Sequence, residues 1–290
     1  MPELPEVETV VRDLRPLLKK QRIASVDVRL QKIVAMPVRL FVKSLVGRAI
    51  TNVRRRAKII MIELDNQTTL LVHLKMSGQL VFVSSRGTKQ YGGHPIVGGI
   101  DALPNKYSHV ILRFQNGGHL YFNDQRQFGY MLVLPEHELA SFFQKKKLGL
   151  EPFDKKFTLP YFLAYAKRHI RALIKSVLLD QSNVVGLGNI YVDEVLFAAG
   201  IRPSRRVASL SLNKIESIYL AIPKILGQAI KQRGTTFRSY RGGTGQPGGM
   251  QKLLKVYGRE GERCRKCRRG VITRIKQGSR SSHYCPVCQK

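Results

Sequence analysis

The hydrophobic and polar positions of the chain follow one pattern in its first half and another in its second. Apolar residues recur at helical spacing over residues 3–20, and short alternating or β-branched segments then follow one another to about residue 134. The predicted strands are 26–30, 59–64, 69–74, 79–83, 109–114, 119–122 and 130–134. Strands grouped in this way predict an antiparallel β-sandwich preceded by one helix.

The second half changes to helical spacing. The predicted helices are 158–167, 170–180, 189–199 and 212–232, the last of them bent at Pro223. A protein with its strands first and its helices afterwards belongs to the α+β class.

The pattern also predicts where the domains end. Residues 135–155, which include three consecutive lysines and Pro152, are typical of a linker. The predicted segments are a β-sandwich domain over 1–134, the linker 135–155, a helical domain over 156–258 and a small C-terminal module over 259–290.

The longest irregular stretch is 234–250, where six glycines in 17 residues preclude regular structure. A plain linker to the C-terminal module is one interpretation. The stretch also carries Phe237, Arg238, Tyr240 and Arg241, which are residue types that stack on bases and bind phosphates, so a mobile lid is the other interpretation.

All four cysteines of the chain lie in two C-x-x-C pairs, Cys264 with Cys267 and Cys285 with Cys288, separated by 17 residues. Disulfides are one possibility. The paired spacing and the lack of a secretory signal favour one structural Zn²⁺ in a reducing compartment. Four thiolates leave no open coordination position, so this zinc would hold a fold together and would not do chemistry.

Charge indicates the kind of partner. Lys and Arg number 50 against 19 Asp and Glu, which gives a net charge of +31, and residues 251–290 alone hold 12 basic against 2 acidic residues. Such a balance predicts a polyanionic partner. A membrane surface is the competing partner, but no apolar run reaches about 18 residues. Nucleic acid is favoured, and we expect a cytoplasmic protein associated with the nucleoid.

The chain begins Met-Pro-Glu-Leu-Pro-Glu, which places Pro2, Glu3 and Glu6 at a free amine once Met1 is removed. A terminal amine is half deprotonated at about pH 7.7–8.0, so it is a usable nucleophile near neutrality. A secondary amine condenses with a sugar anomeric carbon to a cationic iminium, and Glu3 could supply the proton. The alternative interpretation is that this segment only starts a helix.

Within the helical half, Gly186-Leu-Gly188-Asn189 joins two predicted helices. A Gly-x-Gly pair can be a tight packing turn. Because this one ends at a helix N-terminus and follows Lys175 on the preceding helix, it can also form a backbone clamp for phosphate.

Several of these segments together resemble the formamidopyrimidine-DNA glycosylase family, and the resemblance runs from Pro2 to Lys290. The matching segments are Pro2-Glu-Leu-Pro-Glu-Val-Glu8, Arg55-Arg-Ala-Lys58, His73-Leu-Lys-Met-Ser-Gly78, Asn123-Asp-Gln-Arg-Gln-Phe-Gly129, Gly186-Leu-Gly-Asn-Ile-Tyr191 and the four-cysteine module. The family fold implies a helix-two-turn-helix in the helical domain, a lesion-capping loop over 234–250 and a zinc finger over 259–290.

The resemblance implies a bifunctional DNA glycosylase and AP lyase of base excision repair. Its substrates would be 8-oxoguanine and formamidopyrimidines in duplex DNA. Pro2 would attack the anomeric carbon, Glu3 would act as an acid on the sugar ring oxygen, Glu6 would support the terminal site, and Lys58 would bind phosphate beside the sugar. β- and δ-elimination would then cut the strand.

The resemblance also implies DNA contacts. Met76 and Phe128 would fill the gap left by the flipped base, and Arg126 would donate to the abandoned partner base, preferably cytosine. His73, Lys175, Asn189 and Arg280 would contact the DNA around it. The chain departs from the family in having Gln127 and Lys75 where other members often have a basic residue and a glycine.

Two alternatives remain from the sequence. An endonuclease VIII-like glycosylase for oxidised pyrimidines would share the fold and the amine chemistry. A non-catalytic zinc-ribbon DNA-binding protein would share the charge and the cysteines, and only the terminal proline with Glu3 separates it from an enzyme. In either case a monomer without a membrane partner is expected.

Overall fold

The computed structural model describes residues 1–93, 102–235 and 248–290. It contains two compact units, one made of residues 1–144 with 232–251 and the other of residues 145–231 with 252–290. Residues 232–251 thus belong to the first unit, although the sequence pattern places the stretch 234–250 within the helical segment.

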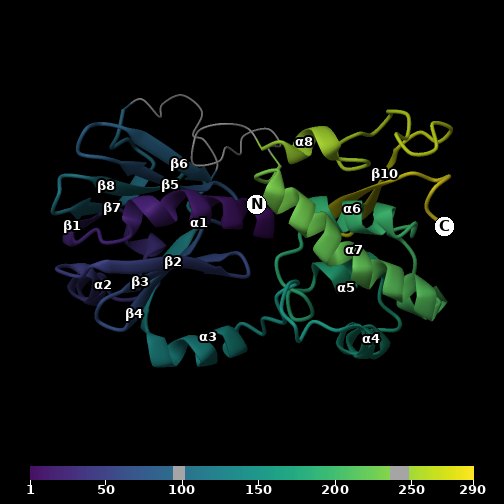
Figure 1. Cartoon of the computed structure of the whole chain (residues 1–290), viewed down its shortest axis with the longest axis horizontal. Coiled ribbons are helices and arrows are strands. Elements are labelled where there is room, and N and C mark those ends of the chain that lie inside the picture. Colours follow the sequence, from purple (N-terminus) through teal and green to yellow (C-terminus); the bar gives the residue numbers. More distant parts are fainter. Residues whose placement is uncertain (94–101, 236–247) are drawn as a thin grey trace. The chain divides into compact units, whose positions relative to one another are not determined.

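The first unit is a β-sandwich with helices around it (Figure 1). Its elements are α1 (Leu4–Leu18), β1 (Ile23–Val28), α2 (Val38–Leu45), β2 (Ile50–Arg56), β3 (Ile59–Leu64), β4 (Thr68–His73), β5 (Gly78–Val83), β6 (Lys89–Gly93), β7 (Ser108–Phe114), β8 (His119–Asp124), β9 (Tyr130–Pro135) and α3 (Leu139–Lys145). One sheet has the order β1-β7-β8-β5-β6 and the other β2-β3-β4-β9, and every pair within them is antiparallel.

The core of this unit lies between the two sheets and includes the apolar face of α1. Every second residue of a strand points into it, as Ile60 and Ile62 do on β3 and Leu120 and Phe122 do on β8. Each such side chain contributes roughly 1.5–3 kcal/mol when it leaves water. The alternation in the sequence is therefore the direct cause of the sandwich.

Most predicted strands are found within one or two residues of their expected ends, but β2, β6 and α2 were missed. β2 carries consecutive arginines at its end and only Ile50 and Val53 as buried apolar residues. β6 ends in two glycines. Neither segment shows the branched, alternating composition that identifies a strand.

The helix α3 corrects the expectation of a linker over residues 135–155. Leu139, Phe142 and Phe143 have the i, i+3, i+4 spacing of one helix face, and they pack on Met61 and Leu71 on the outer face of the four-stranded sheet. This part of the segment is therefore folded onto the sandwich.

The second unit contains α4 (Leu159–Arg168), α5 (Ile174–Leu179), α6 (Asn189–Ala198), α7 (Leu212–Lys231) and a hairpin of β10 (Thr273–Gln277) and β11 (Arg280–Tyr284). A short helix, α8 (Met250–Leu253), spans the boundary between the units. All four predicted helices are present, and Pro223 lies inside α7. α5 begins four residues later than predicted, because Leu173 instead forms an isolated bridge with Arg206.

Candidate active site and nucleic-acid interface

The N-terminal residues form a buried, hydrogen-bonded start to α1. Pro2 is buried, and Glu3 and Glu6 are 3% and 2% exposed. The Glu6 carboxylate accepts the backbone N–H of Glu3 at 2.9 Å, and the Glu3 side chain accepts the backbone N–H of Glu6, so the two form a capping box. The helix-start interpretation is confirmed, and the two carboxylates are buried at the start of the helix that directly follows Pro2.

Glu6 also contacts the ends of the glycine-rich stretch. Its second oxygen accepts the backbone N–H of Thr235 at 2.8 Å. Gly234 has φ +77°, and a Cβ there would lie 2.8 Å from the Glu6 carboxylate, so only glycine fits. Arg233 binds both carboxylate oxygens of Asp13 at 2.7 Å. The side chains proposed for a lid, Phe237, Arg238, Tyr240 and Arg241, lie outside the described residues.

Lys58 lies in the turn between β2 and β3 and is 6% exposed. Close to this turn, Arg55 donates to Glu8 of α1 at 3.0 Å, which holds the end of β2 against the helix. Burial alone would raise the pKa of Glu8, but hydrogen bonds and charge from Arg12 and Arg55 lower it below its ordinary value. The ion pairs therefore fix the strand that leads to Lys58.

Met76, Arg126 and Phe128 come together on the surface of the first unit. Met76 lies in the turn between β4 and β5, and the other two lie in the loop after β8. These loops are neighbours because β5 pairs with β8, with Gly78 opposite Asp124. One Arg126 guanidinium nitrogen lies 3.2 Å from the Met76 sulfur, and its carbon lies 4.8 Å from the centre of the Phe128 ring.

This cluster has the composition expected of a stacking wedge. Met76 is 43% exposed and Phe128 is 54% exposed, which is unusual for large apolar side chains. An exposed apolar pair next to a guanidinium can enter a base stack and donate to a base edge.

His73 lies at the end of β4, half-buried, and its Nδ1 accepts the backbone N–H of Lys75 at 3.0 Å. Its ring lies 5.5 Å from that of Tyr130. The two departures from the family, Lys75 and Gln127, both have positive φ, +49° and +55°. A glycine is the usual residue for such a backbone, so the lysine at 75 is under conformational strain.

In the second unit, the segment between α5 and α6 forms a compact turn. Gln181 donates to the carbonyls of Leu179 and Leu187 at 2.9 Å each and accepts the N–H of Gly186. Gly186 has φ +94°, and Gly188 is the N-cap of α6. The turn therefore presents the N-terminus of α6 in a fixed conformation.

Lys175 is deeply buried, not exposed on this turn. Its ammonium lies 2.6 Å from the Asp193 carboxylate and 2.9 Å from the carbonyl of Ser281, and it is 2% exposed. Asn189 donates to the same Ser281 carbonyl at 2.9 Å. Both predicted DNA-contact residues thus hold the tip of the β10–β11 hairpin, beside the exposed Arg280.

Two further acidic residues, missed by the sequence analysis, join α6 to the C-terminal module. Asp193 accepts the backbone N–H of His283 at 2.8 Å. The carboxylate of Glu194 accepts the consecutive N–H groups of residues 255–257 at 2.9–3.1 Å. Their signal in the sequence is an acidic pair inside an otherwise apolar helix, NIYVDEVLFA.

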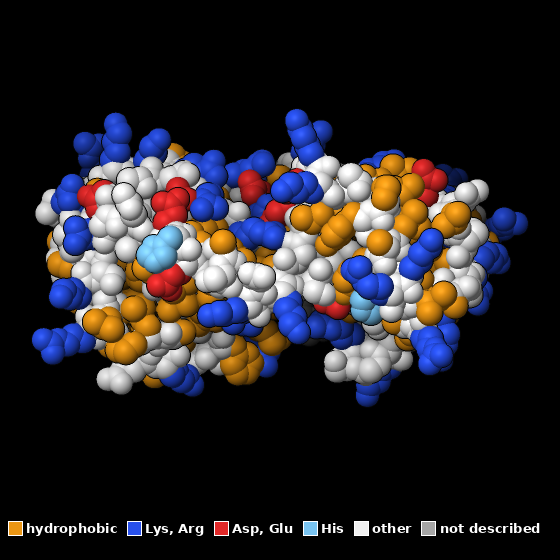
Figure 2. All heavy atoms as spheres, turned by 90° about the horizontal axis from the view of Figure 1, so that it is seen from below, with side chains coloured by type: hydrophobic (Ala, Val, Ile, Leu, Met, Phe, Trp, Pro, Cys, Tyr) orange, Lys and Arg blue, Asp and Glu red, His pale blue; other side chains and the backbone are white. Residues whose placement is uncertain are grey.

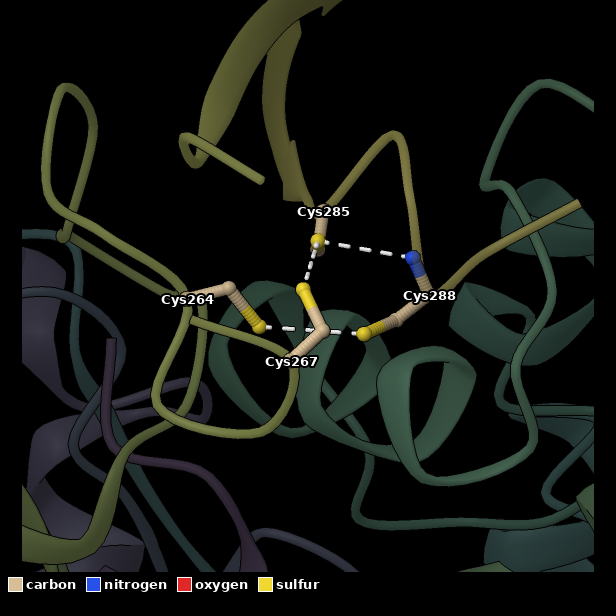
Figure 3. A group of neighbouring side chains, drawn as sticks. All are labelled: Cys264, Cys267, Cys285 and Cys288. Atoms are coloured by element: carbon tan, nitrogen blue, oxygen red, sulfur yellow. Dashed lines mark hydrogen bonds between the residues drawn. The ribbon is translucent and has the colours of Figure 1, made fainter. Parts of the chain in front are cut away.

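The four cysteines point toward one another (Figure 3). All four sulfurs lie within 4.8 Å of one another, and the pairs Cys264–Cys288 and Cys267–Cys285 are 3.8 Å apart. A tetrahedron with Zn–S bonds of about 2.3 Å has S–S edges of about 3.8 Å, so the cluster fits this ion. The backbone N–H groups of Gly270 and Arg269 lower the pKa of Cys267 to about 6, whereas burial raises the pKa of Cys285 and, together with the neighbouring thiols, raises that of Cys288 to about 12. Binding of the ion must therefore displace protons from these thiols.

Lys and Arg side chains are spread over the face drawn in Figure 2, on both units. This distribution fits a polyanion that contacts more than one element. Over residues 1–93, 102–235 and 248–290, no helix has the length and apolar composition needed to cross a membrane.

Three segments of the chain match three family models. Residues 1–131 match the formamidopyrimidine-DNA glycosylase N-terminal domain, residues 148–241 its H2TH domain, and residues 261–290 the zinc finger found in FPG and IleRS. The formamidopyrimidine-DNA glycosylase of Pelotomaculum thermopropionicum is 41% identical over 291 residues, which cover 100% of this chain and 99% of that protein. This chain belongs to the formamidopyrimidine-DNA glycosylase family.

Other members of the family agree with this assignment. The protein of that name from Streptococcus mutans is 39% identical and covers 100% of both chains. An FPG mutant of Lactococcus lactis, solved in complex with DNA containing Fapy-dG, superposes with a TM-score of 0.89 at 35% identity over 100% of both chains. The Lactococcus lactis Fpg in complex with DNA containing an abasic site gives 0.88 over 99% of both chains. The predicted resemblance and the predicted fold class are confirmed.

Proposed function

We propose that this chain removes oxidised purines, 8-oxoguanine and formamidopyrimidines, from duplex DNA and then cuts the strand at the resulting site. The observation that carries the proposal is the N-terminal geometry, in which Pro2 precedes the buried capping box of Glu3 and Glu6. Membership of the family supports the glycosylase step. The DNA complexes of its Lactococcus lactis relative support a DNA substrate.

The chemistry begins at the Pro2 nitrogen, which becomes a free secondary amine when Met1 is removed. This nitrogen attacks the sugar C1′ as the C–N bond to the damaged base breaks. The base leaves with the bonding electron pair and takes up one proton, which balances the proton that the attacking nitrogen loses. Glu3 then protonates the ring oxygen, and the ring opens to give an iminium between Pro2 and C1′. The positive charge acidifies the C2′–H bond.

Strand cleavage follows from that acidity. Loss of the C2′ proton expels the 3′ phosphate by β-elimination, and a second elimination expels the 5′ phosphate. In this proposal Lys58 binds phosphate near the sugar so that C1′ stays close to the amine. Glu6 keeps the Glu3 backbone in position through the 2.9 Å hydrogen bond.

The surface cluster of Met76, Arg126 and Phe128 fills the space vacated by the flipped nucleotide. Extrusion of a base costs stacking and pairing energy, and inserted side chains offset that cost. The Arg126 guanidinium donates to the partner base and favours cytosine, whose O2 and N3 are neighbouring acceptors. Excision opposite adenine would fix a mutation, so this preference suits a repair enzyme.

The four-cysteine cluster holds one structural Zn²⁺, which keeps the β10–β11 hairpin folded. Arg280 and His73 contact the DNA backbone. Lys175 and Asn189 contribute to the same contact because they support the tip of the hairpin. We also propose that the protein acts as a monomer. The bacterial relatives and the net charge of +31 support action on the nucleoid.

Borohydride trapping tests the central step, because it reduces an iminium to a stable amine and links protein to DNA covalently. Protein that begins at Pro2 should become trapped on a duplex with 8-oxoguanine opposite cytosine. The matched control is the same protein with Met1 retained, which should bind the duplex with similar affinity and give no covalent product. Equal trapping of both forms would exclude Pro2 as the nucleophile. If neither form is trapped and neither excises the base, the protein binds DNA without enzyme activity.

A further inference from the structure

A single buried carboxylate lies beneath the two loops that carry Met76, Arg126 and Phe128. Asp124, the last residue of β8, is 0% exposed. Its Oδ1 accepts the Ser77 hydroxyl from the loop of Met76. The backbone N–H of Arg126 is shared between the Ser77 hydroxyl oxygen, at 2.9 Å, and the same Oδ1, at 3.2 Å. Its Oδ2 accepts the backbone N–H of Gly129 at 2.7 Å.

The sheet holds this carboxylate in place. The backbone N–H of Asp124 donates to the carbonyl of Tyr107 at 3.0 Å, and its own carbonyl lies 2.7 Å from Nε2 of His109. On the other side, Asp124 pairs in register with Gly78, the first residue of β5. The side chain therefore extends from a rigid strand end toward both loops.

The loop after β8 closes tightly around Asp124. A Cβ at Gly129 would lie 2.7 Å from the Phe122 ring and 3.0 Å from Oδ2 of Asp124. Gln127, in the middle of the loop, has φ +55°, a conformation that a non-glycine residue rarely adopts without support. Hydrogen bonds to a carboxylate are stronger than neutral ones and can supply that support.

We propose that Asp124 is a positioning residue that fixes the spacing between the Met76 loop and the Arg126–Phe128 loop, so that the three side chains enter the DNA stack as one unit. The inference rests on the proposed insertion of this cluster. Asp124 does not touch DNA; it acts through Ser77 and through the backbone N–H groups at 126 and 129.

Replacement of Asp124 by asparagine separates positioning from simple packing, because the two side chains have nearly the same shape. An amide offers one oxygen and one NH₂ group, whereas both Asp124 oxygens accept. If the NH₂ takes the place of Oδ1, it faces the N–H of Arg126. If it takes the place of Oδ2, it faces the N–H of Gly129. In either orientation the Arg126–Phe128 loop loses an acceptor.

Excision kinetics on two duplexes provide the test, with 8-oxoguanine opposite cytosine or opposite adenine. In Asp124→Asn we expect single-turnover excision opposite cytosine to fall by about tenfold to a hundredfold, the range caused by a misplacement of about 1 Å. The ratio of the cytosine rate to the adenine rate should move toward one. Affinity for undamaged duplex should stay within about twofold, because phosphate contacts dominate it.

A fluorescent base, 2-aminopurine, placed next to the lesion reports insertion directly, since its emission rises when it unstacks. The wild-type protein should raise the emission, and Asp124→Asn should raise it less. The matched control is Ser108→Ala, which removes a buried 2.8 Å hydrogen bond to Asn123, next to Asp124, without touching either loop. It should lower thermal stability and leave both the rate ratio and the emission unchanged.

The outcomes separate the inference from the function beneath it. The inference is wrong if Asp124→Asn keeps the emission and the rate ratio of the wild-type protein. It is also wrong if Ser108→Ala loses both to the same extent as Asp124→Asn. If the wild-type protein causes no change in emission, both the proposed insertion of the cluster and the positioning role of Asp124 are wrong. If Arg126→Ala keeps the rate ratio while Asp124→Asn loses emission, the cytosine role of Arg126 fails and the positioning role of Asp124 stands.

Discussion

Two predicted DNA-contact cations, Arg126 in the first unit and Lys175 in the second, have opposite environments. In the first unit, Arg126 is exposed between Met76 and Phe128 and faces solvent with them. In the second, Lys175 is 2% exposed and paired with Asp193, which is itself fully buried. The sequence assigned both cations to contact with DNA. Arg126 is exposed and can contact DNA from the surface, whereas the Lys175 ammonium is paired with Asp193 and supports the hairpin that carries Arg280.

The physical difference is desolvation. A charge taken out of water needs a partner of opposite charge and further hydrogen bonds, and removal of one partner leaves the other uncompensated. Exposed Arg126 carries no such penalty, so its replacement should change DNA recognition and leave the free energy of unfolding nearly unchanged. Replacement of Lys175 should mainly lower the free energy of unfolding.

The largest expected effect concerns the cysteine cluster on which the second unit depends. Cys267→Ser should lose about one metal ion per chain and most duplex binding, because the hairpin that carries Arg280 would no longer be held. Metal content and a titration of labelled duplex measure the two losses. Val287→Ala, an exposed change inside the other Cys-x-x-Cys pair of the cluster, is the control and should keep both properties. Full affinity in the metal-free protein would show that the module is dispensable.

The buried ion pair should give the next largest effect. Lys175→Met or Asp193→Asn alone should lower the free energy of unfolding by about 3–5 kcal/mol, and changing Lys175 and Asp193 together to apolar residues should recover part of it. Urea denaturation provides the measurement. Arg126→Ala should change the same quantity by about 0.5 kcal/mol or less. Similar losses for the Lys175 and Arg126 variants would remove the distinction between the two units.

Partner-base discrimination sharpens the comparison on the exposed side. Arg126→Ala should reduce the preference for cytosine over adenine by about 1–3 kcal/mol, which is the scale of a good base-edge contact. Phe128→Ala should slow excision opposite both bases alike, because an inserted ring responds to stacking and not to hydrogen-bonding groups. Single-turnover rates on the paired duplexes decide between these roles, and a cytosine preference that survives in Arg126→Ala would speak against the assignment.

The smallest expected effect contrasts two glutamates, Glu8 on α1 and Glu194 on α6. Arg12 and Arg55 outweigh burial and lower the pKa of Glu8. Burial raises the pKa of Glu194, and the Asp193 carboxylate adds to this, although backbone N–H groups oppose it. Glu8 therefore stabilises the fold above its ordinary pKa, and this contribution is lost as the pH falls through the lowered value. The contribution of Glu194 is present below its ordinary pKa and is lost as the pH rises through the raised value.

Unfolding free energies measured between about pH 7 and pH 3, a range that extends below the ordinary pKa of a glutamate, should show these opposite signs. The advantage of wild type over Glu8→Gln should shrink as the pH falls, and the advantage over Glu194→Gln should grow. Each unit of pKa difference between the folded and unfolded states corresponds to about 1.4 kcal/mol. Slopes of the same sign for the two variants would contradict the assigned environments.

The sequence by itself determined the elements whose signal is local. The run of branched residues along β3 and the helical spacing along α1 and α7 identified these elements within a residue or two, because each signal needs only the residues of its own segment. The cysteine spacing identified the metal-binding cluster in the same way. The motifs from Pro2 to the cysteines identified the family.

Only the tertiary structure decided what each polar residue does. The helix α3 is stable because Leu139 packs on the outer face of a sheet built from distant residues. The strand β2 forms because β3 pairs with it, although its own sequence ends in arginines. Lys175 became a buried support and Asp124 a shared acceptor because elements far apart in sequence bring Asp193 and Ser77 to them. A side chain's type sets the interactions it can make, but burial and the partners brought by the fold select which of them occur.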